Sequence, residues 1–375
     1  MTQNRDHFAA FAPHTLLKHA VYGYYVERWS RILLRHFDLL RIVDACAGEG
    51  GDEAGNPGSP LIGLRKAAGA AAQLTAALAT PKRVELVAIE RNRSKYRTLV
   101  QRIGTIGDAR VVHGTLADVV DELSRDSRTI PHLYFIDPFG VSPLRADVIR
   151  RALLGPRNEV FLLFAGPAIL RHFGAFEGAY ASDEESPQGS LFSELSTPVT
   201  PNLTQAQQTA AASSEAILDA AYGTMDWRAL LSLSGNKLLP AVELYCDVLL
   251  SLGARRVLPM PILDEDLHLK YHLIYATKSN TGFKVMKEEI SRALGKQLVG
   301  SEGGVRLGMS GKISEVVDSV RHHFRSAAET SWNEVKEFAM EETRYMPWQR
   351  ERLQMELKPY VISGRRNAPV YRFRI

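Results

Sequence analysis

The stretch Asp44-Ala45-Cys46-Ala47-Gly48-Glu49-Gly50 decides the fold class of this chain. It follows the apolar run Leu39-Leu40-Arg41-Ile42-Val43, so an acidic residue stands where a buried strand passes into a turn of small residues. Glycine at such a turn lets the backbone approach a ligand where a Cβ atom would collide. The spacing is not Gly-x-Gly-x-x-Gly, so the dinucleotide fingerprint is absent and a nicotinamide-dependent dehydrogenase is disfavoured.

Apolar runs recur through the first half of the chain, separated by segments with helical periodicity. After a first strand at residues 41–45, we expect parallel strands at 84–89, 110–113, 133–136 and 160–164. Later runs near 254–258 and at 271–277 are expected to close the edge of the sheet. Strands that are apolar on both faces and alternate with helices predict a sheet covered on both sides. The fold class is therefore α/β, with a Rossmann-like sheet.

Two domains are expected from the length of 375 residues, at roughly 100–200 residues per domain. We predict an α/β domain over 1–300, with a flexible insertion at 182–214 that is rich in Ser, Thr, Pro, Gln and Ala. Helical patterns at 313–324, 332–341 and 347–357 are followed by a hairpin pattern around Gly364-Arg365-Arg366-Asn367. This order predicts a small α+β winged-helix-like domain over 304–375, although a small helical bundle gives a similar pattern.

Composition excludes few function classes. The net charge of +4 is mild, so nucleic-acid binding would need locally clustered arginines. Cys46 and Cys246 lack the spacing of metal ligands or of a disulfide framework, so we expect no metal site and a reducing cytoplasm. We find no apolar signal core at the N-terminus and no run long enough to span a membrane, so no membrane partner is expected.

Ligands of an open parallel sheet bind at the carboxyl ends of its strands, so the residues there are the candidate site. Asp44, Ala45, Cys46, Gly48 and Gly50 follow the first strand and are candidate cofactor-binding residues. Ser59-Pro60 predicts the N-cap and first turn of an Ala-rich helix, in two pieces around Gly69. Glu90 ends the second strand, where a carboxylate can accept two hydrogen bonds from a ribose diol; a solvated acid is the alternative.

Thr115 and Asp118 follow the third strand. Methyltransferases often place an acidic or polar group at this position, near the amino group of the adenine, so the resemblance to them makes both residues candidate cofactor contacts. A helix N-cap at Thr115 accounts for the same residues equally well.

The fourth strand is followed by Asp137-Pro138-Phe139-Gly140, where Asp137, Pro138 and Phe139 are candidate catalytic residues. The stretch resembles the Asp-Pro-Pro-Phe/Tyr motif of methyltransferases that modify exocyclic amines, in a shifted register. A carboxylate with a carbonyl held outward by proline can accept both amine hydrogens, and the aromatic ring can stack on a planar substrate. A simple turn at Asp137-Pro138 is the alternative.

Residues 44–50 resemble the first motif of class I S-adenosylmethionine-dependent methyltransferases. Most of the chain resembles the three-Cys-motif partner proteins, a bacterial family with a methyltransferase-like domain. That resemblance, which leaves out the insertion at 182–214, is carried by Lys18-His19 and the helix after it, and by the segments 43–50, 55–62, 136–140, 270–277 and 338–343. It implies S-adenosylmethionine as cofactor and a partner protein with a cysteine triad like that of radical S-adenosylmethionine enzymes. Cys46 and Glu49 depart from the family, which tends to have Phe and Pro there.

Two functions are open at this point. The first is methyl transfer from S-adenosylmethionine to a nitrogen of a planar or nucleotide-like small-molecule substrate. The second is a non-catalytic accessory module whose C-terminal region binds nucleic acid. Arginines gather there among aromatic residues, and a solvated basic face explains them equally well. They are Arg344, Arg350, Arg352, Arg365, Arg366, Arg372 and Arg374, with Trp348, Tyr360 and Tyr371 between them.

Overall fold

The computed structural model describes residues 13–104, 106, 108–138, 140–180, 205–263, 269–298, 306–307, 313–365 and 368–373. Its central element is an eight-stranded sheet in the order β3-β2-β1-β4-β5-β7-β6-β8. The strands are β1 (Leu39–Asp44), β2 (Arg83–Glu90), β3 (Ala109–His113), β4 (His132–Ile136), β5 (Glu159–Phe164), β6 (Arg256–Leu263), β7 (Leu269–Thr277) and β8 (Arg306–Leu307). The predicted strands are confirmed, with ends that differ by a few residues.

The direction of the strands fixes which ends meet. Strands β1 to β5 are parallel, and β7 lies antiparallel between β5 and β6. Strand β1 lies between β2 and β4, with Asp44 opposite Ala88 on one side and Phe135 on the other. The strand order reverses at β1, so the carboxyl ends of β1, β2 and β4 form the edge where such sheets bind ligands.

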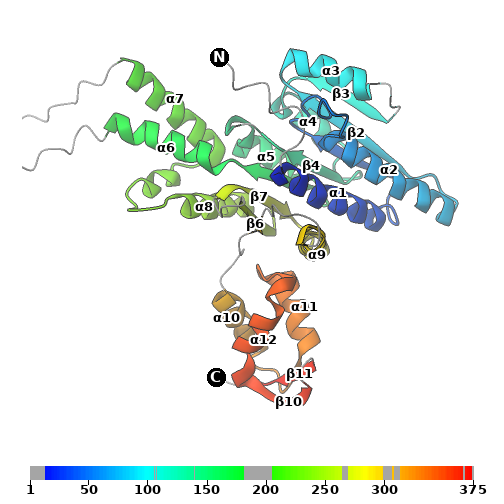
Figure 1. Ribbon diagram of the computed structural model, residues 1–375, viewed down its shortest axis with the longest axis vertical. Helices are drawn as coiled ribbons and strands as arrows, with labels where there is room; N and C mark the ends of the chain where they lie inside the picture. The colour runs from blue at the N-terminus through cyan, green and yellow to red at the C-terminus, as the bar shows by residue number, and fades with distance from the viewer. Residues whose placement is uncertain are drawn as a thin grey trace, which may run out of the picture.

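Helices cover both faces of the sheet, as its apolar strands predict (Figure 1). One face packs against α1 (Pro13–Leu33), α2 (Ser59–Leu78), α3 (Arg93–Ile103) and α9 (Asn280–Leu298). The other packs against α4 (Leu116–Ser124), α5 (Ala146–Ala152), α6 (Gly166–Tyr180), α7 (Gln205–Tyr222) and α8 (Leu238–Ser251). Short 3-10 helices η2 (Ser142–Leu144) and η4 (Asp226–Leu230) join these elements. Within the described ranges, no helix combines the length and apolarity needed to cross a membrane.

Two local predictions are wrong. The Ala-rich segment is one continuous helix, α2, because Gly69 lies in open space and its cost of about 1 kcal/mol is offset by the helix-forming alanines around it. The predicted insertion at 182–214 includes ten residues that belong to α7, since Ala211 and Ser214 are buried where α7 packs beside α6. The rest of that insertion, up to residue 204, lies outside the described residues.

The C-terminal unit, residues 313–373, has its own core and its own small sheet. Its elements are α10 (Ile313–Phe324), β9 (Thr330–Ser331), α11 (Trp332–Glu342), η5 (Pro347–Gln349), α12 (Arg350–Glu356), η6 (Lys358–Tyr360), β10 (Val361–Arg365) and β11 (Ala368–Tyr371). Strand β11 pairs antiparallel with both β10 and β9. The three helical segments and the hairpin occur where the sequence predicts them.

Buried contacts join the C-terminal unit to the larger one. Lys287 on α9 is fully buried and donates to Met340 O at 2.7 Å and to Thr343 O at 2.5 Å, at the carboxyl end of α11. Met346 is fully buried within the core that contains α1 and α9. Arg344 also pairs with Glu243 on α8 at 2.7 Å. The unit is therefore packed onto α8 and α9 rather than only tethered to them.

Candidate functional site

The loop after β1 presents backbone at the carboxyl edge of the sheet. Gly48 and Gly50 have φ of 60° and 79°, the left-handed region that the predicted tight turn requires. Gly58 N donates to Gly50 O at 2.9 Å, so the chain folds back closely on itself. A Cβ atom at Gly48 would meet no heavy atom within 4 Å. The space beside Gly48 is open to a ligand.

Asp44 is a fully buried carboxylate with an unmet hydrogen bond. Its Oδ1 accepts from Cys46 N at 3.3 Å, and the Ser59 hydroxyl also hydrogen bonds to the carboxylate. Oδ2 is buried and has no partner in the part of the chain that the structure describes. Burial raises the pKa of Asp44 to about 7, against the lowering effect of these two hydrogen bonds. A cationic ligand group would supply both the missing donor and a counter-charge.

Ser59 does not cap α2 as the sequence predicts. The N-cap is Gly58, and Ser59 is the first residue of the helix. Its hydroxyl hydrogen bonds to Asp44 instead, because a buried carboxylate is costly unless donors satisfy it.

Glu90 holds the loop to the neighbouring strand. Its Oε2 accepts from Gly48 N at 2.9 Å and its Oε1 accepts from Asn92 N at 2.6 Å. A carboxylate has about four lone-pair sites, so each oxygen can accept one further hydrogen bond. The side chain can therefore accept from two adjacent hydroxyl groups while it keeps the loop in place.

Thr115 and Asp118 form the capping box of α4, the alternative that the sequence left open. Asp118 Oδ2 accepts from Thr115 N at 2.7 Å and from Thr115 Oγ1 at 2.8 Å. These two bonds hold the pKa of Asp118 below its usual value. Both residues thus have a structural role that is independent of any ligand.

Asp137 follows β4 and hydrogen bonds to Lys18 of α1. The Lys18 side chain is only 8% exposed and that of Asp137 is 22% exposed. Pro138 is buried, and Phe139 lies outside the described residues. The carboxylate that the sequence assigns to an acceptor amine is therefore already engaged by an ammonium group.

Further residues from α1 and β7 surround this ion pair. Burial and Lys18 lower the pKa of His19 to about 4, so its imidazole is neutral at pH 7. Tyr271 on β7 donates to His14 O at 2.9 Å, which holds the start of α1 against the sheet. Burial, with Asp44 nearby, raises the pKa of the Cys46 thiol, so Cys46 is not an activated nucleophile. The sequence points to Lys18, His19 and Tyr271 only through a family resemblance, because no motif spacing connects them to Asp137.

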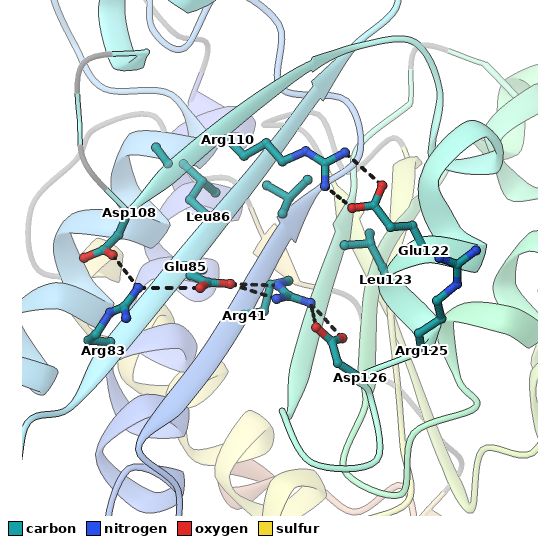
Figure 2. A pocket seen from close by; sticks show the side chains of 12 residues that line it. Arg41, Arg83, Glu85, Leu86, Asp108, Arg110, Glu122, Leu123, Arg125 and Asp126 are labelled. Carbon is teal, nitrogen blue, oxygen red and sulfur yellow. Dashed lines mark hydrogen bonds and ion pairs between the residues drawn. The ribbon is translucent and has the colours of Figure 1, made fainter.

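A pocket of about 370 Å³ opens at the opposite edge of the sheet, near the amino ends of β1, β2 and β3 (Figure 2). Arg41 lies at its centre and pairs with Glu85 at 2.8 Å and with Asp126 at 2.7 Å. Arg110 pairs with Glu122 on the same wall. These charges neutralise one another, and none of the predicted site residues lines this pocket.

The comparisons with known proteins are distant. No family model and no curated protein matches the chain. Among solved structures, protein LPL1258 from Legionella pneumophila is 10% identical over 79% of this chain and 98% of its own, with a TM-score of 0.39. A putative class I S-adenosylmethionine-dependent methyltransferase from Listeria monocytogenes is 10% identical over 72% and 64%, with a TM-score of 0.32. A putative caffeoyl-CoA O-methyltransferase from Staphylococcus aureus is 9% identical over 67% and 82%, with a TM-score of 0.29.

Because these TM-scores are low, the fold is assigned from the strand order of the sheet and not from the comparisons. The order β3-β2-β1-β4-β5, parallel throughout and reversing at β1, is that of a Rossmann-like α/β fold.

Proposed function

We propose that this protein transfers a methyl group from S-adenosylmethionine to a nitrogen atom of a planar or nucleotide-like acceptor. The observation that supports this most is the arrangement of Asp44, Glu90 and Asp137 at the carboxyl ends of three adjacent strands. Asp44 lies opposite Ala88 and Phe135, and Glu90 and Asp137 each follow those residues by two positions. Three carboxylates at a topological switch point suit a ligand with both a cationic group and a ribose.

Each part of the cofactor has a matching group in this proposal. The unpartnered oxygen of Asp44 suits the α-ammonium of the methionine portion, directly or through a water. The Glu90 carboxylate suits the two ribose hydroxyls, and the open space beside Gly48 admits the chain between them. Ala45, Cys46 and Gly50 line the same turn. When bound, S-adenosylmethionine would supply an electrophilic methyl group, and the protein would align it with the acceptor.

The acceptor is assigned to Asp137 and Lys18. An exocyclic amine can replace the Lys18 ammonium as hydrogen-bond donor to Asp137, since both present N–H groups to one carboxylate. Lys18 would then hold the carboxylate in position until the acceptor arrives. As the resemblance to the amine-methylating motif implies, we assign to Pro138 the role of holding a backbone carbonyl outward to accept an amine hydrogen. We assign to Phe139 the role of stacking its ring on the planar acceptor.

Isothermal titration with S-adenosylmethionine tests cofactor binding. We expect one site per chain, with a Kd in the range of ~1–100 µM. Asp44→Asn and Glu90→Gln should each weaken binding at least tenfold. Glu85→Gln is the matched control, because Glu85 lies at the opposite edge of the sheet among the ion pairs of Arg41. Absence of binding by the folded wild-type protein would contradict the proposal.

The chemical step needs a separate assay. With labelled cofactor and pools of nucleosides, RNA and DNA, Asp137→Asn should bind cofactor like the wild type but transfer at least tenfold less label. Transfer to an oxygen or carbon acceptor, read by mass spectrometry, would exclude a nitrogen acceptor.

A second candidate function is favoured by the C-terminal unit. We propose that 304–375 forms a winged helix, and the element order α10-β9-α11-α12-β10-β11, with β11 between β10 and β9, supports this. Arg352 on α12, Lys358 on η6 and Arg365 on β10 are exposed. Arg366 and Arg374 lie outside the described residues. This surface suits the phosphates of a nucleic acid, so the chain would act as an accessory module.

A gel shift separates this function from a solvated basic face. Binding through phosphates should weaken steeply between 50 and 200 mM salt, and an Arg352→Gln, Arg365→Gln double variant should reduce the salt dependence. We also propose a cytoplasmic location, which Cys46 and Cys246 suit because they lack disulfide-framework spacing, and, from the family resemblance, a three-Cys-motif partner. Co-purification of the two proteins from one host tests the partner.

A further inference from the structure

A small pocket of about 170 Å³ lies at the amino end of β5, between α1, α9 and β7. This is the opposite end of the strands from Asp44 and Asp137. Its walls are mostly apolar and come from Trp29, Ile32, Leu33 and Val285. Pockets for drug-sized ligands measure roughly 300–1,000 Å³, so this one suits only a short molecule.

The polar end of the pocket is Glu159, the first residue of β5, which is 4% exposed. Its Oε2 accepts from Tyr25 Oη at 2.5 Å and its Oε1 accepts from Thr277 Oγ1 at 2.9 Å. Within the described ranges, no lysine, arginine or histidine forms an ion pair with it. Burial raises the pKa of Glu159 to about 7, although these hydroxyls act to lower it. The interior of the pocket therefore holds an acid without a counter-cation.

The mouth of the pocket carries the opposite charge. Arg157 is exposed there, with its guanidinium 4.8 Å from the centre of the Phe37 ring. Lys278 is partly buried and donates to Gly155 O at 3.2 Å. Helix α9 begins at Asn280, and Thr281 and Gly282 in its first turn line the pocket. The amino end of this helix therefore adds partial positive charge there.

We propose that this pocket binds a short zwitterion, with its ammonium group against Glu159 and its acid group at the mouth beside Arg157. The ammonium supplies the cation that Glu159 lacks, and the indole ring of Trp29 adds an aromatic face beside it. The acid group of the zwitterion is attracted by the positive charges at the mouth, which would repel an amine that has no acid group. This site is separate from the proposed methyl-transfer site and does not depend on it.

Titration of the full-length protein with three four-carbon probes tests the charge arrangement. The probes are γ-aminobutyrate, n-butylamine and butyrate. We expect γ-aminobutyrate to bind at least tenfold more tightly than either of the others. Glu159→Gln should remove this binding, and Arg157→Gln should weaken it to the level of n-butylamine. Arg31→Gln, an exposed change on α1 outside the lining, is the control and should change nothing.

The proposal is overturned if the three probes bind alike, if Glu159→Gln binds as the wild type does, or if γ-aminobutyrate shows no saturation up to ~10 mM. Circular dichroism checks that the variants fold. Should Glu159→Gln not fold, Leu33→Trp fills the pocket while it leaves Glu159 itself unchanged, and it should abolish binding equally. Retained binding in that variant also overturns the proposal.

Discussion

The ammonium group of Lys18 on α1 hydrogen bonds to the carboxylate of Asp137 after β4, across a separation of 119 residues. Both side chains are largely shielded from water. A shielded ion pair adds little net stability, because desolvation offsets the attraction, but loss of one partner leaves a charge without compensation. The pair therefore fixes where the Asp137 carboxylate lies, at the edge of the sheet that carries the other candidate residues.

Lys18→Met should separate cofactor binding from methyl transfer. We expect methyl transfer to fall at least tenfold, because Asp137 loses its fixed position, while the Kd for S-adenosylmethionine changes less than threefold. The free energy of unfolding should fall by about 1–3 kcal/mol, from the uncompensated carboxylate. Labelled-methyl assays and urea unfolding measure the two effects. Lys66→Met is the control, since Lys66 pairs with Glu27 at the surface and its loss should change stability by only ~0.5 kcal/mol.

Asp44 should make stability depend on pH. Burial raises its pKa in the folded protein to about 7, above the ~3.9 of an unfolded aspartate. The folded state binds this proton more tightly, so the stabilisation is complete below the unfolded pKa and is lost as pH rises through about 7. Asp44→Asn lacks this titration, so its stability relative to wild type should increase from pH 5 to pH 8. Glu159 also has a pKa of about 7, but it is present in both proteins and cancels.

Urea unfolding at several pH values measures that difference. A constant difference between Asp44→Asn and wild type across the range would contradict the buried, protonatable state of Asp44.

Gly58 and Gly48 should respond differently to alanine. At Gly58 a Cβ would lie 2.9 Å from Gly50 C and 3.0 Å from Gly51 N, which are backbone atoms that cannot rotate away. At Gly48 only the left-handed φ of 60° opposes alanine, at about 1–2 kcal/mol. We expect Gly58→Ala to lower stability by ~2 kcal/mol or more. Gly48→Ala should lower it less but weaken cofactor binding, because its methyl group enters the open space. Equal stability losses would contradict this account of the loop.

Asp118→Ala distinguishes the two interpretations of the segment after β3. Loss of the capping box should lower the free energy of unfolding by ~1 kcal/mol. If the cap is the only role of Asp118, the Kd for S-adenosylmethionine stays unchanged. A tenfold weaker Kd would instead support an adenine contact.

The strand-end residues could be predicted because parallel strands place their carboxyl ends along one edge. Asp44, Glu90 and Asp137 each follow an apolar run, so their proximity follows from the fold class alone. Lys18 could not be connected to Asp137 in this way, because their contact depends on how α1 crosses the sheet. The pocket at Glu159 was missed for the same reason, since Tyr25, Glu159 and Thr277 meet only in the folded chain.

The errors near Ser59 and at 205–214 both arise from contacts with residues far away in the sequence. Ser59 follows the capping pattern, but its hydroxyl is drawn to the buried Asp44, which sequence periodicity cannot reveal. The polar composition before Ser214 resembles a loop, but α6 provides a surface against which Ala211 is buried. In both cases tertiary contacts override the local preference.

Lys287→Met should loosen the C-terminal unit. Burial holds the pKa of Lys287 well below its usual value, and its Nζ donates to the carbonyls of Met340 and Thr343 at the end of α11. Methionine fills the volume but leaves Met340 O and Thr343 O without this donor, at about 1–3 kcal/mol for each buried group that stays unpaired. We therefore expect the C-terminal unit to unfold in a separate transition at lower urea. Tryptophan fluorescence detects this transition, because Trp332 lies within the core of the unit.

Lys284→Met is the control, because Lys284 pairs with Glu337 in a more exposed position and its loss should leave a single transition. A single transition with the wild-type midpoint in Lys287→Met would show that Met346 and the remaining ion pairs hold the junction without Lys287.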